Sequence, residues 1–423
     1  MEKGSKIIFS IKKKIGKFCS VCGEGLKKPK RKFLHQMIYG ILASKDVKLS
    51  EISRSLGERI PLIKTENRLS RQLSSQDLTE FLNEKLIQEG KVYIREDTVL
   101  GIDISDISKE YSRAQEYLDK VRDGSTGEIK RGYWMLEVIG AEIEGDRAIP
   151  LYESLYSTRS PGFRSENQEI IEAIEKVRKG AGNKGIWVID RGGDRKKLYL
   201  YLLERGLKFV IRSRGDRMME AEGGEKHRIK VLSKHLSFPC QVKIKIKEKG
   251  KPPKRRKVSM GVKKVRFIFH EEWIWMVAVR GLGKEIIVLL TNLKIEGKED
   301  LLKILEIYLT RWKCEESYRF IKQAYHLEDV RVRKFNSLRN ILAILMSVFF
   351  FLSVVIGEKL RLQILLKKIY EKAKRFYQIP PFKYYALCDG IFNILFGKKF
   401  APSPLPPPPS IPYLFLPFEP LKT

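Results

Sequence analysis

Residues 98–104 read TVLGIDI, and residues 185–190 read GIWVID. Both stretches are short, rich in β-branched and other apolar side chains, and carry an aspartate at or next to their last residue, which is typical of buried strands. In an open sheet the carboxyl ends of the strands face the crevice where ligands bind. The two stretches therefore predict strands that bring Asp103 and Asp190 to the ligand-facing edge of a sheet.

The segments around these stretches predict the rest of that sheet. Further strands are expected at 133–143, 148–157 and 207–213, and helices at 165–179 and 194–205. Three strands in succession, followed by alternating helix and strand, indicate an α/β fold with a mixed sheet flanked by helices.

The N-terminal part has a different texture. Residues 1–95 contain no strand pattern and predict helices separated by short polar turns. Within them, Ser50 precedes the run EISRSL and Gly57 follows it, which are start and stop signals of a helix. This segment has the character of a helix-turn-helix DNA-binding motif, and a plain helical bundle is the alternative.

Residues 214–298 predict an all-β block inserted after the sheet described above. Four strand-like runs occupy 241–249, 264–270, 272–279 and 285–292. Residues 243–266 form the most basic part of the chain, with one acid, Glu248, against twelve Lys and Arg. A phosphate-facing loop is expected there, with a solvated hairpin as the alternative.

The charge of the whole chain points to a polyanionic partner. Its 423 residues carry 83 Lys and Arg against 51 Asp and Glu, a formal net charge of +32. Counterion release makes such a surface bind nucleic acid, although charge alone also allows an anionic membrane or a ribosome. The length favours several domains or one core with insertions.

Several weaker signals favour a soluble, cytoplasmic protein. The apolar run 341–356 is shorter than the ~20 residues of a membrane span and predicts a buried helix, so no membrane partner is expected. Five scattered cysteines do not form a disulfide framework. The pair Cys19 and Cys22 lacks two further ligands for a structural zinc site. The Pro-rich residues 400–420 predict an extended tail without regular structure.

A long helix is expected at 299–326, and one of its faces is chemically unusual. At ~100° per residue, Tyr308, Arg311, Glu315 and Lys322 fall within a wedge of roughly 60°, and Arg319 lies near the same stripe. Glu316 and Glu306 point elsewhere, so the geometry selects Glu315 as a third acid beside the two aspartates. A tyrosine, several cations and one carboxylate on one stripe suit a phosphate and a metal ion better than a core.

These residues resemble a known signature. The spacing Tyr308-(2)-Arg311-(3)-Glu315-(6)-Lys322 resembles the Tyr-Arg-Glu-Lys signature of one branch of bacterial insertion-sequence transposases, the DDE transposases similar to insertion sequence four. The runs GIDISDI and VIDRGGDR resemble that branch's two aspartate strands, and VLLTNL at 288–293 resembles the strand before its signature helix. The resemblance covers about residues 95 to 345.

The resemblance implies an RNase H-like mixed-sheet catalytic core with an all-β insertion, behind an α-helical N-terminal domain. The expected division is a helical N-terminal DNA-binding region at 1–95, core at 96–213 and 299–360, insertion at 214–298, and a C-terminal helical segment with a Pro-rich tail at 361–423.

It also implies the chemistry of the site. Asp103, Asp190 and Glu315 would hold two Mg²⁺ or Mn²⁺ ions, because hard divalent cations prefer carboxylate and phosphate oxygens. Tyr308, Arg311, Lys322 and Arg319 would contact DNA phosphates, and Trp273 or Trp275 would stack on an extruded base, unless the two tryptophans only pack a core.

The function implied is that of a transposase that binds the inverted repeats at transposon ends, cleaves double-stranded DNA and transfers the strand to a target. It would act as a homodimer in the synaptic complex. An RNase H-fold nuclease without strand transfer and a domesticated, non-catalytic DNA-binding protein are the alternatives. The expected location is the cytoplasm, in association with the nucleoid.

Overall fold

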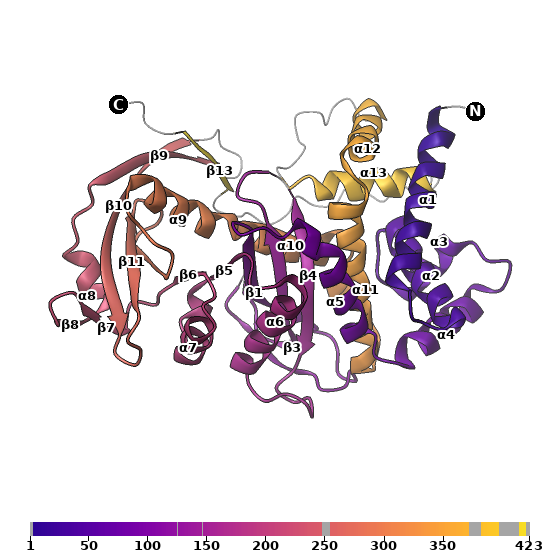
Figure 1. Ribbon diagram of the computed structural model, residues 1–423. Coiled ribbons are helices and arrows are strands. Elements are labelled where there is room, and N and C mark those ends of the chain that lie inside the picture. The colour runs from indigo at the N-terminus through magenta and orange to yellow at the C-terminus, as the bar shows by residue number, and fades with distance from the viewer. Residues whose placement is uncertain are drawn as a thin grey trace.

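A mixed sheet runs through the protein (Figure 1). The computed structural model describes residues 3–124, 126–145, 147–247, 254–371, 382–396 and 414–419. The central strands follow the order β4-β3-β1-β5-β6. Neighbours among β1, β3 and β4 are antiparallel, whereas β5 and β6 run parallel to β1. The bounds are β1 Val99–Ser108, β2 Asp119–Arg122, β3 Ile129–Ala141, β4 Ala148–Tyr156, β5 Ile186–Ile189 and β6 Phe209–Arg212.

One strand position differs from the expectation. Asp103 does not end β1, because pairing with β3 continues to Ser108. The parallel pairing with β5 stops earlier, at Ile102 opposite Ile189. Asp103 and Asp190 are therefore the first residues beyond the last paired rung between β1 and β5, where the sheet opens.

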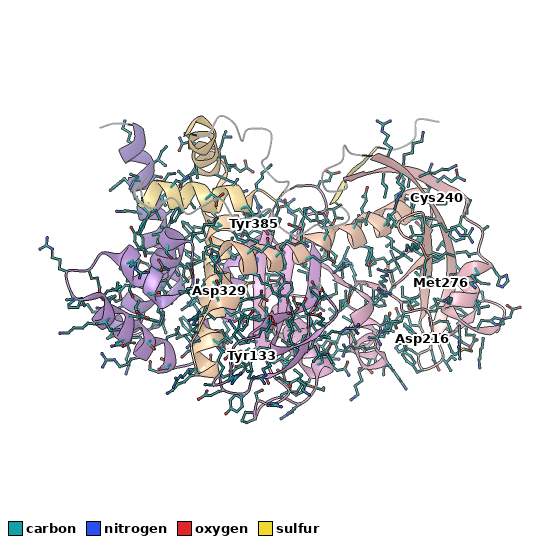
Figure 2. All side chains as sticks on the ribbon, turned by 180° about the vertical axis from the view of Figure 1, so that it is seen from behind. Tyr133, Asp216, Cys240, Met276, Asp329 and Tyr385 are labelled. Atoms are coloured by element: carbon teal, nitrogen blue, oxygen red, sulfur yellow. The ribbon has the colours of Figure 1, made fainter. Side chains whose placement is uncertain are left out.

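Helices cover both faces of this central sheet. Apolar side chains alternate along the strands: Leu100 and Ile102 belong to one buried cluster, and Val99 to the other. The first face is covered by α6 (Glu166–Ala181) and α7 (Lys196–Glu204). The helix α9 (Lys298–Thr310) packs on the second face, and α10 (Trp312–Ala324) continues it over β1 and β3. From behind, α9 and α10 cross the sheet from the insertion towards the N-terminal helices (Figure 2).

The expected single helix at 299–326 is interrupted at Arg311. There the backbone stays right-handed helical, but the amide of Arg311 bonds to the carbonyl of Tyr308, three residues back. Such a tightened turn changes the direction in which the following side chains point. The interruption separates α9 from α10 immediately before Glu315.

The block between β6 and α9 extends the central sheet. Its strand β12 pairs with β6, so the sheet continues in the order β12-β11-β10-β9. The expectation of an all-β insertion is wrong in one element, the short helix α8, whose Ile229 and Leu232 are buried on one side. The bounds are β7 Met218–Ala221, β8 Lys226–Arg228, α8 Ile229–Lys234, β9 Cys240–Lys247, β10 Lys254–Phe267, β11 Trp273–Arg280 and β12 Ile287–Thr291. The tip of the basic loop, residues 248–253, lies outside the described residues.

Helices form the N-terminal part, on the far side of β4 from the insertion (Figure 1). The helix expected between Ser50 and Gly57 is α3, which begins at Leu49, so Ser50 lies inside it. Gly57 ends it with a φ of 58°, a left-handed conformation that glycine adopts without strain. The bounds are α1 Lys3–Cys22, α2 Lys28–Ser44, α3 Leu49–Leu56, α4 Leu62–Ser74, α5 Thr79–Gly90 and η1 Lys91–Tyr93.

The apolar run predicted as a core helix is α11 (Phe335–Phe350), followed by the π-helical turn η4 (Phe351–Val355). The stretch Phe335–Val355 is long and apolar enough to cross a membrane, but 83% of its apolar window is buried against other parts of the chain. It packs against β4, α2, α4 and α5, and so joins the N-terminal helices to the central sheet.

The C-terminal part adds α12 (Glu358–Glu371), α13 (Tyr384–Phe396) and β13 (Leu414–Glu419). The expectation of a tail without regular structure is wrong at β13, which pairs antiparallel with β9. Its register shifts between Leu416 and Glu419, on either side of Pro417, because proline has no amide hydrogen for the ladder. The remaining Pro-rich residues lie outside the described part of the chain.

Candidate active site

The three acids predicted from the sequence line one cavity. Asp103, Asp190 and Glu315 share a cavity of about 1350 Å³ that opens where β5 ends beside β1. Asp103 comes from β1, Asp190 directly follows β5, and Glu315 lies in the first turn of α10. Three elements that are distant in sequence thus deliver one carboxylate each to the same space.

Arg311 lies among these acids. Its guanidinium is 2.5 Å from the Glu315 carboxylate and 3.8 Å from that of Asp103. Burial raises the pKa of Asp103 to about 7; Arg311 opposes this rise, and the charges of Glu315 and Asp190 add to it. Burial alone would lower the pKa of Arg311, but the carboxylates of Glu315 and Asp103 outweigh it and raise that pKa. One cation therefore leaves excess negative charge in the site.

The turn after β5 holds Asp190 and, four residues later, Asp194. The Asp190 carboxylate accepts a 2.6 Å hydrogen bond from the amide of Gly192, so the turn fixes its side chain. Asp194 is buried and accepts hydrogen bonds from the Ser213 hydroxyl, at 2.9 Å, and from Arg217, at 2.6 Å. These contacts show that Asp194 ties this loop to the start of the insertion.

Close contacts dock α10 on β1 and β3. The Tyr318 hydroxyl lies 2.7 Å from the carbonyl oxygens of both Asp103 and Met135. The Ser317 hydroxyl donates to the buried carboxyl of Glu137. A side chain at Gly101 would collide with the Cys314 sulfur, so the glycine lets the helix approach the strand. These contacts fix the position of α10, and with it that of Glu315, relative to Asp103 on β1.

The remaining residues of the predicted stripe, Tyr308, Lys322 and Arg319, do not share one environment. Tyr308 is buried among the apolar side chains of α9 and the insertion, with its ring centroid 5.8 Å from the Arg311 guanidinium. Lys322 and Arg319 line the cavity. Lys322 lies 3.6 Å from Asp106 and 3.4 Å from Glu328, and Arg319 pairs with Glu316. The interruption at Arg311 rotates α10 relative to α9, which a single ideal helix could not anticipate.

Trp273 and Trp275 lie on β11, away from the lining of this cavity. They share one face of the strand and are half-buried. The guanidinium of Arg266 lies 5.1 Å from the Trp273 ring centroid, and Trp275 packs against the apolar cluster beneath α9. Both rings therefore have partners within the insertion.

Sequence reasoning missed a group of residues at the far end of the cavity. Lys109 is buried, and its ammonium group donates to three carbonyl oxygens, those of Leu327, Glu328 and Val330. Burial lowers the pKa of Lys109 to about 8. These carbonyls belong to the turn η3 (Leu327–Asp329) after α10 and the residue that follows it. A lysine in a strand-like sequence carries no signal of such a role.

The donor set suits divalent cations. Carboxylates are the ligands that Mg²⁺ and Mn²⁺ prefer, and the excess negative charge around Asp103 is what a cation would relieve. Within the described residues, no three His, Cys, Asp or Glu side chains form a closed metal-binding group. Glu315 is bonded to Arg311, and its side chain is 45% exposed. Rotation of this one side chain is the change that would free it for a metal ion.

The Cys19 and Cys22 thiols are buried in α1, among apolar side chains of the N-terminal core. Burial raises the pKa of Cys19 to about 12. Zinc binds thiolates, so this environment disfavours the metal and fits packing residues.

The comparison with protein families agrees with the chemistry of the cavity. Residues 155–351 match the family model described as "Transposase DDE domain". This segment includes Asp190 and Glu315 and begins after Asp103. The match supports a DDE transposase, a class of enzyme that cleaves and transfers DNA.

Among solved structures, the chain is similar to one described as "Cryo-EM structure of piggyBac transposase synaptic complex with hairpin DNA (SNHP)". The identity is 12%, the TM-score is 0.41, and the match covers 95% of this chain and 84% of that chain. The branch with the Tyr-Arg-Glu-Lys signature remains a prediction.

Proposed function

We propose that this chain is a DNA transposase that binds the inverted repeats at transposon ends, cleaves there and transfers the strand to a target. The observation that supports it most is the meeting of Asp103, Asp190 and Glu315 in one cavity at the open end of the sheet. The strand order β4-β3-β1-β5-β6, with β5 and β6 parallel to β1, supports an RNase H-like core for this site. The strands β7 to β12 then form the insertion.

In this proposal Asp103, Asp190 and Glu315 hold two divalent cations, Mg²⁺ or Mn²⁺. When bound, such ions supply positive charge to both the attacking and the leaving oxygen of a phosphoryl transfer. The protein's own part is to hold the acids: the Gly192 amide fixes Asp190, and the Tyr318 hydroxyl anchors the β1 backbone at Asp103.

The cations around the cavity bind the DNA backbone. Arg311 is placed to exchange Glu315 for a phosphate, because both are anions within reach of its guanidinium. Lys322 and Arg319 line the same wall and add charge there. Tyr308 acts through Arg311, over which its ring lies. A base-stacking role for Trp273 or Trp275 requires the DNA to reach the insertion, and two chains are proposed to pair the two transposon ends.

The test uses a supercoiled plasmid that carries the DNA flanking both sides of the coding region, incubated with protein and Mg²⁺. We expect nicking at the ends and no nicking by Asp190→Ala. The matched control is Asp97→Ala, which removes an exposed aspartate just before β1, outside the cavity. Nicking that is random in position, or unchanged in Asp190→Ala, would sink the proposal.

The same reaction separates a transposase from a nuclease. A transposase also yields products in which the cleaved end is joined to a second plasmid. Cleavage at the ends without such joined products would assign the site to a nuclease on the same fold.

A further inference from the structure

A second cavity adjoins the catalytic cavity. It has a volume of about 610 Å³ and lies between α4 and the segment after η3. The same residues line both cavities where they meet, namely Lys48, Val330, Arg331 and Arg333. The space at the acids is therefore continuous with a space at the α3–α4 helix pair.

The boundary between the two cavities is an extended segment, Val330–Lys334, which we call the strap. Side chains of an extended chain alternate, so Arg331 and Arg333 project to one side. Both are exposed, whereas Val330 is buried and Val332 packs against the main core on the other side. The strap follows Asp329, which Figure 2 labels between the N-terminal helices and the sheet.

Hydrogen bonds hold the strap along its backbone. The Gln115 side-chain amide donates to the Val332 carbonyl at 2.7 Å, and the Glu116 amide donates to the Arg333 carbonyl at 2.9 Å. Lys109 donates to the Val330 carbonyl at 3.1 Å. The strap is thus fixed through its carbonyl groups, and its arginine side chains are left for another partner.

The charge changes from one cavity to the other. The lining of the catalytic cavity has eight acidic side chains, the three acids among them, and eight basic ones, whereas the lining of the second cavity has four basic side chains against one acidic, Glu66. The four are Lys48, Arg331, Arg333 and Lys334. In the described residues Arg331, Arg333 and Lys334 have no ion-pair partner within 4.0 Å. On the facing wall, α4 presents Asn67, Ser70 and Ser74, small polar side chains of the kind that bond to phosphate oxygens.

We propose that the strap binds the phosphates of a DNA strand and guides it from the catalytic cavity to the α3–α4 helix pair, so that the backbone of one duplex runs along the linings of both cavities. This inference rests on the proposed function, because it takes the polyanion to be the DNA that is cleaved. Because the backbone of the strap is already ordered, binding of a phosphate by these guanidinium groups costs only the freedom of the side chains. The α3–α4 pair then contacts the duplex beyond the cleaved end.

The first test measures binding rather than cleavage. The affinity of the full chain for a duplex of about 40 base pairs of arbitrary sequence is measured against NaCl concentration, in EDTA. We expect Arg331→Ala/Arg333→Ala to lower the salt slope by about 2 and the affinity by at least about tenfold. The charge-matched control is Lys179→Ala/Lys184→Ala, which removes two exposed cations that line neither cavity. Equal losses in both variants, or no loss in either, would overturn the proposal.

Two further variants keep this result interpretable. Arg331→Lys/Arg333→Lys keeps both charges and is expected to retain most of the slope, which a folding defect would not allow. Asn67→Glu places a negative charge on the α4 wall and is expected to weaken binding, whereas Gln76→Glu adds the same charge outside both cavities. Unchanged binding by Asn67→Glu would contradict a path that reaches α4.

A membrane partner gives a different outcome. Vesicles of phosphatidylcholine with phosphatidylserine serve as the second anionic probe. Loss of vesicle binding without loss of DNA binding in Arg331→Ala/Arg333→Ala would assign the strap to a lipid surface and overturn the DNA path. Since these assays contain no divalent cation, they are independent of the plasmid reaction. If the protein nicks transposon ends but the salt slope of the strap variant is unaltered, the proposed role of the strap is refuted and the transposase proposal stands. If DNA binding depends on the strap but no nicking occurs, the transposase proposal is refuted and the role of the strap stands.

Discussion

Asp103, Glu137 and Glu153 stand side by side on one face of the sheet, yet only one of them lines the cavity of the candidate active site. Asp103 pairs with Glu137 across β1 and β3, and Glu137 pairs with Glu153 across β3 and β4. The Asp103 side chain is 17% exposed, whereas Glu137 and Glu153 are fully buried. The same chemical group thus occupies three adjacent positions in three environments.

The number of polar groups that contact the carboxyl decreases from Asp103 to Glu137 to Glu153. Asp103 faces Arg311, Glu137 accepts one hydrogen bond from Ser317, and both carboxyl oxygens of Glu153 lack a hydrogen-bond partner in the described structure. Burial raises the pKa of all three. A buried carboxyl is therefore not in itself a catalytic group. Access to the cavity and nearby charge distinguish Asp103 from its neighbours.

The largest expected effect is on catalysis. Asp103→Asn should lower end cleavage by at least about 10³-fold, the scale on which loss of one essential catalytic group is measured in other enzymes. Its free energy of unfolding should not fall, because Asp103 is a desolvated acid near Asp190 and Glu315. The cleavage rate on plasmid ends and a urea titration measure the two quantities.

Two controls make this comparison strict. Asp97→Asn removes an exposed acid before the start of β1, and Glu153→Gln removes the acid two strands away on the same face. Both should cleave within about tenfold of the parent rate. Retention of comparable activity by Asp103→Asn would contradict the assignment of the site.

The next largest effect is on stability, at the contact between α10 and β1. Gly101→Ala should destabilise the protein by about 2–3 kcal/mol, because the added methyl group meets the Cys314 sulfur. Cys314→Ala in the same chain should recover part of this loss, since the Cys314 Cβ lies 3.7 Å from the new methyl group, an ordinary contact.

Gly16→Ala is the control: nothing lies within 4 Å of its added methyl group. Being helical, it should stabilise by about 0.5–1 kcal/mol. Additive losses in Gly101→Ala and Cys314→Ala would show that the collision is not the cause.

The sequence predicts the acids better than their surroundings. The apolar runs before Asp103 and Asp190 and the helical phase of Glu315 are local signals, and the structure brings all three residues to one cavity. The continuation of β1 to Ser108 depends on pairing with β3, and the local sequence of β1 does not encode this pairing. The interruption at Arg311 carries no capping or proline signal. The ion pair between Lys322 and Asp106 joins two elements that are far apart in the sequence.

The buried polar contacts were still harder to foresee. Lys109 looks like any lysine that follows a strand, although it binds three carbonyls of a turn that lies more than 200 residues later. The pairing of β13 with β9 is similarly non-local. Periodicity reports which face of an element is buried, but the partner of a polar group is set by the tertiary fold.

A smaller effect should depend on pH. Burial raises the pKa of Glu153 from 4.5 to about 8. Between these values the unfolded chain loses the proton and the folded chain keeps it, so the stability of the protein falls as pH rises from about 4.5 to 8. Glu153→Gln removes this dependence, and its stability relative to the parent should therefore be greater at pH 6.5 than at pH 5, by on the order of 2 kcal/mol. Urea midpoints at both values measure this, with exposed Glu84→Gln as the control. An equal difference at the two pH values would mean that Glu153 titrates normally.

The smallest effect concerns the anchor between α10 and the Asp103 backbone. Tyr318→Phe removes a hydroxyl that lies 2.7 Å from the Asp103 and Met135 carbonyls, and should cost about 1 kcal/mol. Tyr156→Phe removes a buried hydroxyl that has no hydrogen-bond partner among the described residues, and should be neutral or slightly stabilising. The same urea titration measures both. If Tyr318 positions Asp103, its loss should also slow cleavage severalfold at saturating DNA, whereas Tyr156→Phe should leave the rate unchanged. Equal effects of the two substitutions would make Tyr318 an ordinary core residue, and the position of Asp103 would then depend on the β1–β3 ladder alone.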